Sequence, residues 1–217
     1  MKRFNTIRPI YQWTISIVFS ILLILLLGWW IQVVSSNKFL CLLIFGMVPI
    51  IQFLITPLLT CLKLYHYYSP MVVSFGNNKV IDLHNGTSFD YLMDMRNVKP
   101  GIDWKRKMLI HYLKAFIAII NKMETGQMDK SITVRGSSYF ISNRSAEKIG
   151  FTIHKAAFAE KINIVLNYFD LIWMYSLANG AIMLPNLKDI KTVKIDGESL
   201  IKKKGDITTL LDYLNKK

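Results

Sequence analysis

Two uncharged apolar stretches decide the architecture of this chain: YQWTISIVFSILLILLLGWWIQVV at Tyr11–Val34 and FLCLLIFGMVPIIQFLITPLLTCL at Phe39–Leu62. As a helix, each stretch is roughly 36 Å long at about 1.5 Å per residue. The hydrocarbon core of a bilayer is about 30 Å thick, so each stretch is long enough to cross it with some tilt. Only Ser35–Lys38 separates the stretches, so the helices must be antiparallel neighbours. The sequence therefore predicts an N-terminal transmembrane hairpin over residues 11–62.

The basic residues around the hairpin predict its orientation. Lys2, Arg3 and Arg8 precede the first helix, and Lys63 follows the second. The connecting loop has only Lys38. Under the positive-inside rule, the more basic flanks stay in the cytoplasm. We therefore expect a basic cytoplasmic N-terminus at residues 1–10 and a multi-pass protein of the plasma (inner) membrane, with both termini cytoplasmic.

A stripe of polar residues follows one face of each predicted helix, because residues four apart share a face. Folding the chain about residue 36 brings these side chains together as three pairs: Gln12 with Thr60, Ser16 with Thr56, and Ser20 with Gln52. Hydrogen bonds between such groups on two membrane helices contribute roughly 0.6–2 kcal/mol each. We expect a packing seam rather than a polar pathway for a solute, since a proton or ion relay would need an ionisable group at membrane depth.

The remaining residues, 64–217, suffice for one compact domain. Of the 27 basic residues, 22 follow Lys63, as do all 14 acidic residues, so this domain has a net charge of +8. A basic domain beside a bilayer indicates attraction to anionic inner-leaflet lipids. No nucleic-acid-binding motif accompanies the charge, so nucleic acid is not an expected partner. Cys41 and Cys61 lie at opposite ends of one helix, too far apart for a disulfide, and the sequence has no metal-ligand spacing or cofactor motif.

Turn and capping signals predict that this domain is α+β. We expect a β-hairpin of Met71–Phe75 and Lys79–Leu83, then a short helix through Met95 that Thr87 or Ser88 caps. The other expected elements are a helix from Asp103 to about Thr125, strands at Ser131–Arg135 and Tyr139–Ile141 around Gly136–Ser138, a short helix at Asn143–Ile149, a strand at Phe151–Lys155, a buried helix from about Glu160 to Ala178, a hairpin of Thr192–Ile195 and Ser199–Lys202, and a last helix capped by Asp206.

The most site-like stretch is His84–Asp90, HNGTSFD, at a predicted strand-to-helix turn. His84 is a candidate general base, Ser88 a candidate nucleophile, and Asp90 the carboxylate that would accompany them. Ordinary turn and capping chemistry explains the same residue types, because Asn-Gly makes a turn and a hydroxyl caps a helix. Both interpretations stay open on the sequence alone.

Two short glycine-hydroxyl motifs are candidate anion sites, since backbone N–H groups at such turns can cradle a phosphate. The first contains Gly86 and Thr87, and the second contains Ser137 and Ser138 in the predicted Gly136–Tyr139 turn. If both turns face one pocket, they can bind one phosphate-bearing ligand.

A cluster of three basic residues, Lys105, Arg106 and Lys107, lies at the start of the long predicted helix. The helix dipole favours acidic residues at this end. The misfit predicts an external anionic partner such as lipid head groups, although a solvated helix start also accommodates it.

Two functions remain open. Because catalytic motifs are missing, we favour a non-catalytic, membrane-anchored interaction or regulatory module that binds anionic lipid, a protein partner or a second copy of the chain. The alternative is a membrane-associated enzyme that acts on a lipid-linked or phosphorylated substrate through the His84–Asp90 turn. It requires that this turn and the Gly136–Tyr139 turn line one pocket near His111 or His154.

Overall fold

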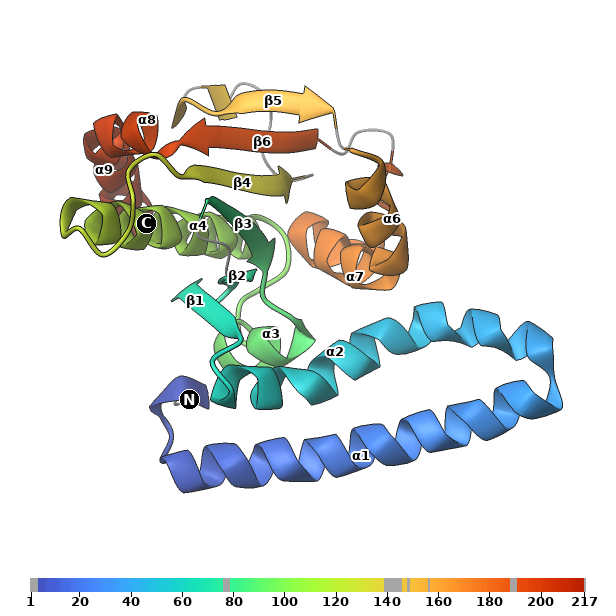
Figure 1. Ribbon diagram of the computed structural model, residues 1–217. Helices are drawn as coiled ribbons and strands as arrows, with labels where there is room; N and C mark the ends of the chain where they lie inside the picture. The colour runs from blue at the N-terminus through green and yellow to red at the C-terminus, as the bar shows by residue number, and fades with distance from the viewer. Residues whose placement is uncertain are drawn as a thin grey trace.

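The chain forms two long apolar helices and then an α+β unit built on one sheet (Figure 1). The computed structural model describes residues 4–75, 79–138, 146–147, 149–155, 157–187 and 191–216. The described helices are α1 (Pro9–Ser36), α2 (Ile44–Cys61), α3 (Ser88–Asp94), α4 (Ile102–Glu124), α6 (Phe158–Leu166), α7 (Tyr168–Asn179), α8 (Gly197–Lys202) and α9 (Lys204–Asn215), with short 3-10 helices η1 (Phe4–Thr6) and η2 (Lys38–Leu43). The described strands are β1 (Tyr65–Ser69), β2 (Val72–Phe75), β3 (Val80–Asn85), β4 (Thr133–Ser138), β5 (Thr152–Lys155) and β6 (Lys191–Asp196).

The two N-terminal helical segments, Pro9–Ser36 and Lys38–Cys61, are each long and apolar enough to cross a membrane. Of their most apolar 18-residue windows, only 6% and 11% of the residues are buried. Many of their leucine and isoleucine side chains are exposed, whereas the core helix of a soluble protein buries such side chains. The expected α+β class with two long apolar N-terminal helices is confirmed.

The residue pairs predicted for the seam between α1 and α2 are wrong, because the polar side chains of the two helices have other partners. Ser16 faces Cys61, with 3.2 Å between Oγ and Sγ. The polar side of α2 faces the α+β unit instead of α1, because hydroxyl groups of that unit are the hydrogen-bond partners of the α2 threonines. Thr56 lies 2.9 Å from the Thr87 hydroxyl, and Thr60 lies 3.3 Å from the Tyr67 hydroxyl.

An aromatic cluster fixes α3 against both apolar helices. The ring of Phe89 in α3 lies 5.3 Å from Phe4, 6.2 Å from Phe19 in α1 and 5.7 Å from Phe53 in α2. Each of these is an edge-to-face contact, the geometry that the charge distribution of an aromatic ring favours. The α+β unit is thus packed on the hairpin through buried side chains rather than joined to it by a loop alone.

The six-stranded sheet has the order β1-β2-β3-β4-β6-β5. Strands β3 and β4 are parallel, with Leu83 opposite Gly136, and the other neighbours are antiparallel. A parallel pair needs a crossover, and α3 with α4 supplies it. The Tyr65–Ser69 segment, which follows the hairpin and was not among the expected strands, is the edge strand β1.

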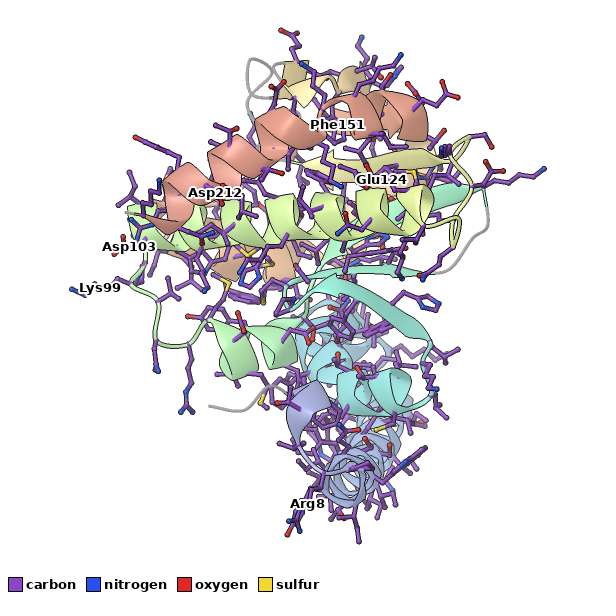
Figure 2. The ribbon with its side chains drawn as sticks, turned by 90° about the vertical axis from the view of Figure 1, so that its left-hand side faces the viewer. Arg8, Lys99, Asp103, Glu124, Phe151 and Asp212 are labelled. Carbon is purple, nitrogen blue, oxygen red and sulfur yellow. The ribbon has the colours of Figure 1, made fainter. Side chains whose placement is uncertain are left out.

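One face of the sheet packs against α4, α8 and α9. Figure 2 shows α4, whose ends are marked by Asp103 and Glu124, beside α9, which carries Asp212. Alternation along β3 buries Ile81 and Leu83 on this face and places Asp82 and His84 on the other. The buried apolar residues of the main core include Ile81, Leu83, Leu113, Phe116, Ile119, Ile120, Val134, Val193, Ile195, Leu200 and Ile207.

Several expected elements are confirmed because short-range signals determine them. Strands β2 and β3 form the predicted antiparallel hairpin. Helix α3 begins directly after Thr87, and Asp90 accepts a 2.8 Å hydrogen bond from the Thr87 backbone N–H. Helix α4 and strand β5 also lie where they were expected.

The predicted turn at Gly136–Ser138 is wrong. Strand β4 runs without interruption to Ser138 and pairs with β6, where Ser137 lies opposite Thr192 and Ser138 opposite Lys191. Glycine fits here because a Cβ on Gly136 would lie only 3.3 Å from the Leu83 carbonyl oxygen, and a strand glycine often marks such a close backbone approach. The strand expected at 139–141 and most of the helix expected at 143–149 lie outside the described residues.

Three C-terminal expectations are also wrong. The predicted second hairpin is replaced by β6 and then α8, because the Asp196 side chain accepts a hydrogen bond from Ser199 N (2.8 Å) and caps a helix. The last helix begins at Lys204, so Asp206 lies in its first turn rather than at its cap. The helix expected at 160–178 is divided at Asn167 into α6 and α7.

Candidate functional site

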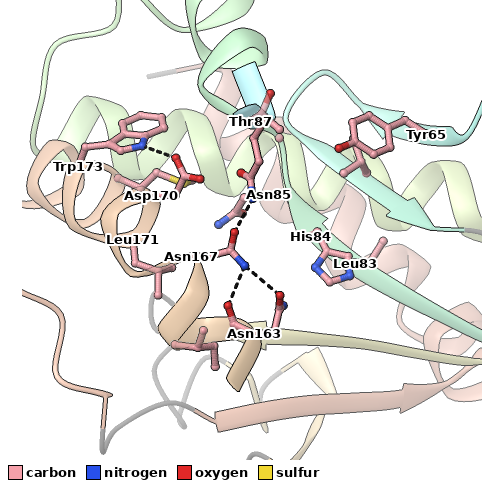
Figure 3. Close-up of a pocket in the computed structure, with 15 residues that line it drawn as sticks. Tyr65, Leu83, His84, Asn85, Thr87, Asn163, Asn167, Asp170, Leu171 and Trp173 are labelled. Carbon is pink, nitrogen blue, oxygen red and sulfur yellow. Dashed lines mark hydrogen bonds between the residues drawn. The ribbon is translucent and has the colours of Figure 1, made fainter. Parts of the chain in front are cut away.

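A cleft of about 240 Å³ lies where α2, the polar side of the sheet, α6 and α7 meet (Figure 3). We call it the junction cleft. Side chains from segments far apart in the chain converge on it. Its main polar groups come from Gln52, His84, Asn85, Asn163, Asn167 and Asp170.

Four of these residues carry carboxamides, and three of them, Gln52, Asn163 and Asn167, are connected by hydrogen bonds. Asn167 Oδ1 accepts a hydrogen bond from Gln52 Nε2, across from α2. Asn167 Nδ2 donates to the backbone oxygen (2.7 Å) and Oδ1 (2.9 Å) of Asn163. Residues 163 and 167 share a helical face, so α6 presents both amides to the cleft. Asn85 Oδ1 accepts from the Tyr112 hydroxyl, which leaves its NH₂ group to donate.

Asp170 supplies the carboxylate of the cleft, from the first turn of α7. One oxygen, Oδ1, accepts a 2.9 Å hydrogen bond from Trp173 Nε1. The other, Oδ2, is buried and has no hydrogen-bond partner among the described residues. Burial raises the pKa of Asp170, and the Trp173 hydrogen bond lowers it by less. A buried acceptor without a partner costs free energy, so this oxygen suits a donor from a ligand.

His84 lines the cleft next to the carboxamides. Burial is the main cause that lowers the pKa of His84, although nearby Asp82 opposes the shift. Its Nε2 lies 3.8 Å from Asp82 Oδ2, which also accepts a 2.7 Å hydrogen bond from Arg135. A neutral imidazole offers one donor and one acceptor, so His84 at neutral pH adds to the mixed donor and acceptor character of the cleft.

The predicted catalytic set is not assembled in this cleft. His84, Gly86 and Thr87 line it. Ser88 is the first residue of α3, and Asp90 lines a separate cavity of about 280 Å³. Both oxygens of Asp90 are occupied, Oδ1 by the Tyr67 hydroxyl (2.8 Å) and Oδ2 by Thr87.

The second predicted anion turn does not exist as a turn, because Ser137 and Ser138 belong to β4. His111 is also elsewhere: it is buried on α4, with Nε2 2.9 Å from Asp94 Oδ2. His154 is exposed on edge strand β5.

The basic cluster lies at the start of α4, next to Asp103, well above the end of the hairpin that Arg8 marks in Figure 2. Lys105 Nζ donates a 2.9 Å hydrogen bond to Asn179 Oδ1. Arg106 lies 3.7 Å from Asp103, and its side chain is 36% exposed. Binding of anionic lipid by Lys105–Lys107 therefore stays a prediction.

The sequence analysis missed these residues as part of a site: it placed Gln52 only in the polar stripe of the hairpin, and Asn163, Asn167 and Asp170 only within the helix predicted from about Glu160 to Ala178. A signal was present: 163, 167 and 170 follow helical spacing and put three polar groups on one face. That they meet Gln52, 115 residues away from Asn167, was not readable from such spacing.

The chemistry of the cleft fits an uncharged ligand with many hydroxyl groups. Its described lining contains amide donors and acceptors, one carboxylate and the rings of Trp173 and Tyr65, but no lysine or arginine. No group of three or more acidic, histidine or cysteine residues suited to a metal ion occurs within the described ranges.

No protein-family model, curated protein or solved structure matches this chain. Its function must therefore be inferred from its own geometry.

Proposed function

We propose that this protein is a membrane-anchored binding module whose junction cleft receives the uncharged, hydroxyl-rich head group of a membrane lipid. In this proposal α1 and α2 cross the plasma (inner) membrane as a hairpin, and both termini and the α+β unit are cytoplasmic. The basic flanks of the hairpin and its outward-facing apolar side chains support this orientation.

One observation carries the ligand class: the unpartnered Oδ2 of Asp170 lies in a cleft lined by carboxamides and by the indole of Trp173. A sugar or inositol ring offers hydroxyl donors to a carboxylate and both donors and acceptors to amides. Its C–H face can also pack on an aromatic ring. A phosphate would face the Asp170 carboxylate without a cation in the described lining to offset the repulsion.

The ligand is proposed to be a lipid because Gln52, one of the residues that line the cleft, belongs to an apolar helix that can cross a membrane. The cleft would therefore lie close to the bilayer. A head group attached to a lipid in the same leaflet would reach such a cleft without leaving the bilayer. The expected contacts of Lys105–Lys107 with anionic lipids, and those of the domain with a protein partner or a second copy, are compatible with this proposal and separate from it.

We do not extend the proposal to catalysis. His84 lines the cleft, but Ser88, the nucleophile of the enzyme hypothesis, is not among the described residues that line it. The hydroxyl of Thr87, beside His84, is engaged by Thr56 and Asp90. The base and the nucleophile that the enzyme alternative pairs therefore do not both line the junction cleft.

The proposal can be tested with soluble probes and the full-length protein in lipid nanodiscs. Saturation-transfer NMR would measure binding of methyl β-glucoside and myo-inositol, with glucose 6-phosphate as the charged comparison. We expect saturable binding of at least one uncharged probe, weaker binding of the phosphate, and at least fivefold weaker binding to Asp170→Asn. Asp212→Asn, the same substitution at an exposed site on α9, is the matched control and should bind like the parent protein.

Absence of saturable binding of both uncharged probes would overturn the proposed ligand class. Equal binding by Asp170→Asn would move the site away from the junction cleft, and stronger binding of the phosphate would replace the uncharged ligand with an anion.

A further inference from the structure

We infer that α6 lies in the surface of the bilayer that the hairpin crosses, parallel to the membrane plane, and that the hydrocarbon region begins near Gln52 rather than at Leu62. The inference rests on the proposed membrane anchoring and adds a second contact between protein and lipid. It also places the junction cleft at the level of the lipid head groups.

The first observation is an apolar stripe that points away from the core. Phe158 is 80% exposed, and Ile162, Val165 and Leu166 are 46%, 47% and 43% exposed. These residues are at positions i, i+4, i+7 and i+8, so they form one face of α6. Ile164, on the other side of the helix, is buried. The helix is therefore amphipathic with its larger apolar face outward, as in helices that lie in a membrane interface.

The segment that follows α7 extends this apolar surface. Ile182 is 93% exposed and Leu184 68% exposed. The segment is held along α7, since Met183 N donates to Ser176 Oγ (3.0 Å) and the Tyr168 hydroxyl donates to the Pro185 oxygen (3.4 Å). Two neighbouring elements thus expose large apolar side chains, more than the isolated ones expected on a soluble surface.

The contact between Gln52 and Asn167 sets the level of α6 along the hairpin. Gln52 lies nine residues before Cys61, the end of α2, which corresponds to about 14 Å at 1.5 Å per residue. Asn167 is the junction of α6 and α7. In Figure 1, α6 forms the edge of the α+β unit nearest the turn of the hairpin and runs steeply across the direction of α1 and α2. A helix perpendicular to membrane-spanning helices lies parallel to the bilayer.

The polar stripes of the hairpin end at this level: Ser20 is the last residue of the stripe on α1, Gln52 is the first on α2, and the rings of their neighbours Phe19 and Phe53 lie 5.5 Å apart. Nearer the two ends of the hairpin, Ser16 contacts Cys61 and Thr56 contacts Thr87, and both residues are fully buried. Beyond Ser20, residues 21–36 form a helix about 24 Å long, with Ile24 67% and Leu25 63% exposed. This length is somewhat less than the thickness of the hydrocarbon core, about 30 Å. Bilayers accommodate such a difference by local thinning. The apolar part of the hairpin and the stripe on α6 therefore face the same slab of lipid.

The depth of three positions distinguishes the possibilities. Single-cysteine variants Ile162→Cys, Ile24→Cys and Thr209→Cys would be made in a Cys41→Ser, Cys61→Ser background, labelled with an environment-sensitive fluorophore and reconstituted into vesicles. Lipids carrying a spin label at a shallow or a deep acyl position quench nearby fluorophores. We expect strong quenching at residue 24, which lies four residues, or about 6 Å, beyond Ser20. We expect shallow quenching at residue 162 that is at least threefold stronger than at residue 209, and little at the exposed α9 position 209.

Each alternative result of the quenching experiment would overturn one part of this inference. Quenching at residue 24 with residue 162 no more quenched than residue 209 would refute the contact of α6 with lipid while the anchoring stands. No quenching at residue 24 would refute the anchoring itself. A label at residue 162 that neither lipid nor aqueous iodide quenches, together with cross-linking between copies, would show that a second chain covers the stripe instead.

Discussion

The hydroxyl oxygens of Thr56 and Thr87 lie 2.9 Å apart, which links the middle of apolar helix α2 to the start of α3. The link belongs to a closed ring of hydrogen bonds. Thr87 donates to Asp90, Asp90 accepts from Tyr67 at 2.8 Å, and the Tyr67 hydroxyl lies 3.3 Å from Thr60, back on α2. Burial raises the pKa of Tyr67, which keeps this hydroxyl protonated as a donor. The ring makes the packing of the α+β unit on the hairpin specific in orientation.

Thr56→Val should destabilise the protein, because valine keeps the shape of threonine but cannot bond to Thr87. Thr56 is fully buried, and loss of such a bond leaves the Thr87 hydroxyl with one partner fewer. We expect a loss of about 1–2 kcal/mol in the free energy of unfolding, measured by thermal unfolding in detergent micelles. Thr14→Val is the control, since Thr14 is exposed and bonds only to the Ile10 oxygen one turn earlier. Equal effects of the two substitutions would mean that the Thr56–Thr87 link is dispensable.

Asp90 should make stability depend on pH. Burial raises the pKa of Asp90 to about 6, although hydrogen bonds from Tyr67 and Thr87 oppose the rise. A carboxyl whose pKa is higher in the folded than in the unfolded protein binds its proton more tightly when folded. Its contribution is therefore fully present below about pH 4 and is lost as the pH rises through about 6.

The measurement is the free energy of unfolding of the parent protein and Asp90→Asn between pH 7.5 and pH 4.5. Relative to the variant, which cannot titrate at this position, the parent should gain about 2 kcal/mol between pH 7.5 and pH 4.5. The full shift of about two pKa units corresponds to about 3 kcal/mol, which is reached only below the unfolded-state pKa. Parallel pH profiles of the two proteins would show that the Asp90 carboxyl is not held in this way.

The sequence predicted those features that depend on interactions between residues close together in the chain, and it did not predict those that depend on distant ones. Thr87 and Asp90 are three residues apart, and the start of α3 was predicted from them. The Asp196–Gly197 pair fits both a hairpin turn and a helix start, and burial of Leu200 against the main core decides for the helix. The junction cleft depends on contacts across more than 100 residues, which no local pattern encodes. The outward stripe on α6 was present as a periodicity, but periodicity does not say which side of a helix faces the core.

The buried contact between His111 and Asp94 should stabilise more than an exposed ion pair. His111 Nε2 lies 2.9 Å from Asp94 Oδ2, with side chains 2% and 12% exposed. His111→Leu removes the ring that faces the carboxylate, and we expect a loss of about 2–4 kcal/mol in the free energy of unfolding, because a buried charge loses its partner. Glu124→Gln disrupts the pair with Lys204, whose side chains are 38% and 39% exposed, and should cost less than about 1 kcal/mol. A result in which both substitutions cost the same would contradict this ranking.

Two glycines in neighbouring helices should respond to alanine in opposite directions. A Cβ on Gly197, the first residue of α8, would lie 2.4 Å from the Lys130 oxygen and 2.8 Å from Met123 Sδ. Because Gly197 N also donates a 2.8 Å hydrogen bond to the Ile132 oxygen, the helix start cannot move away freely. Gly197→Ala should therefore cost about 2 kcal/mol or more through overpacking.

Gly205, near the start of α9, has open space where its Cβ would be. Gly205→Ala should leave the packing intact and raise the free energy of unfolding by about 0.5–1 kcal/mol, since alanine has the higher helix propensity. Thermal unfolding of both variants in the same detergent measures the difference. A neutral Gly197→Ala would mean that the 129–132 segment shifts to admit a methyl group, and the close approach of Lys130 to α8 would then not be what restricts position 197 to glycine.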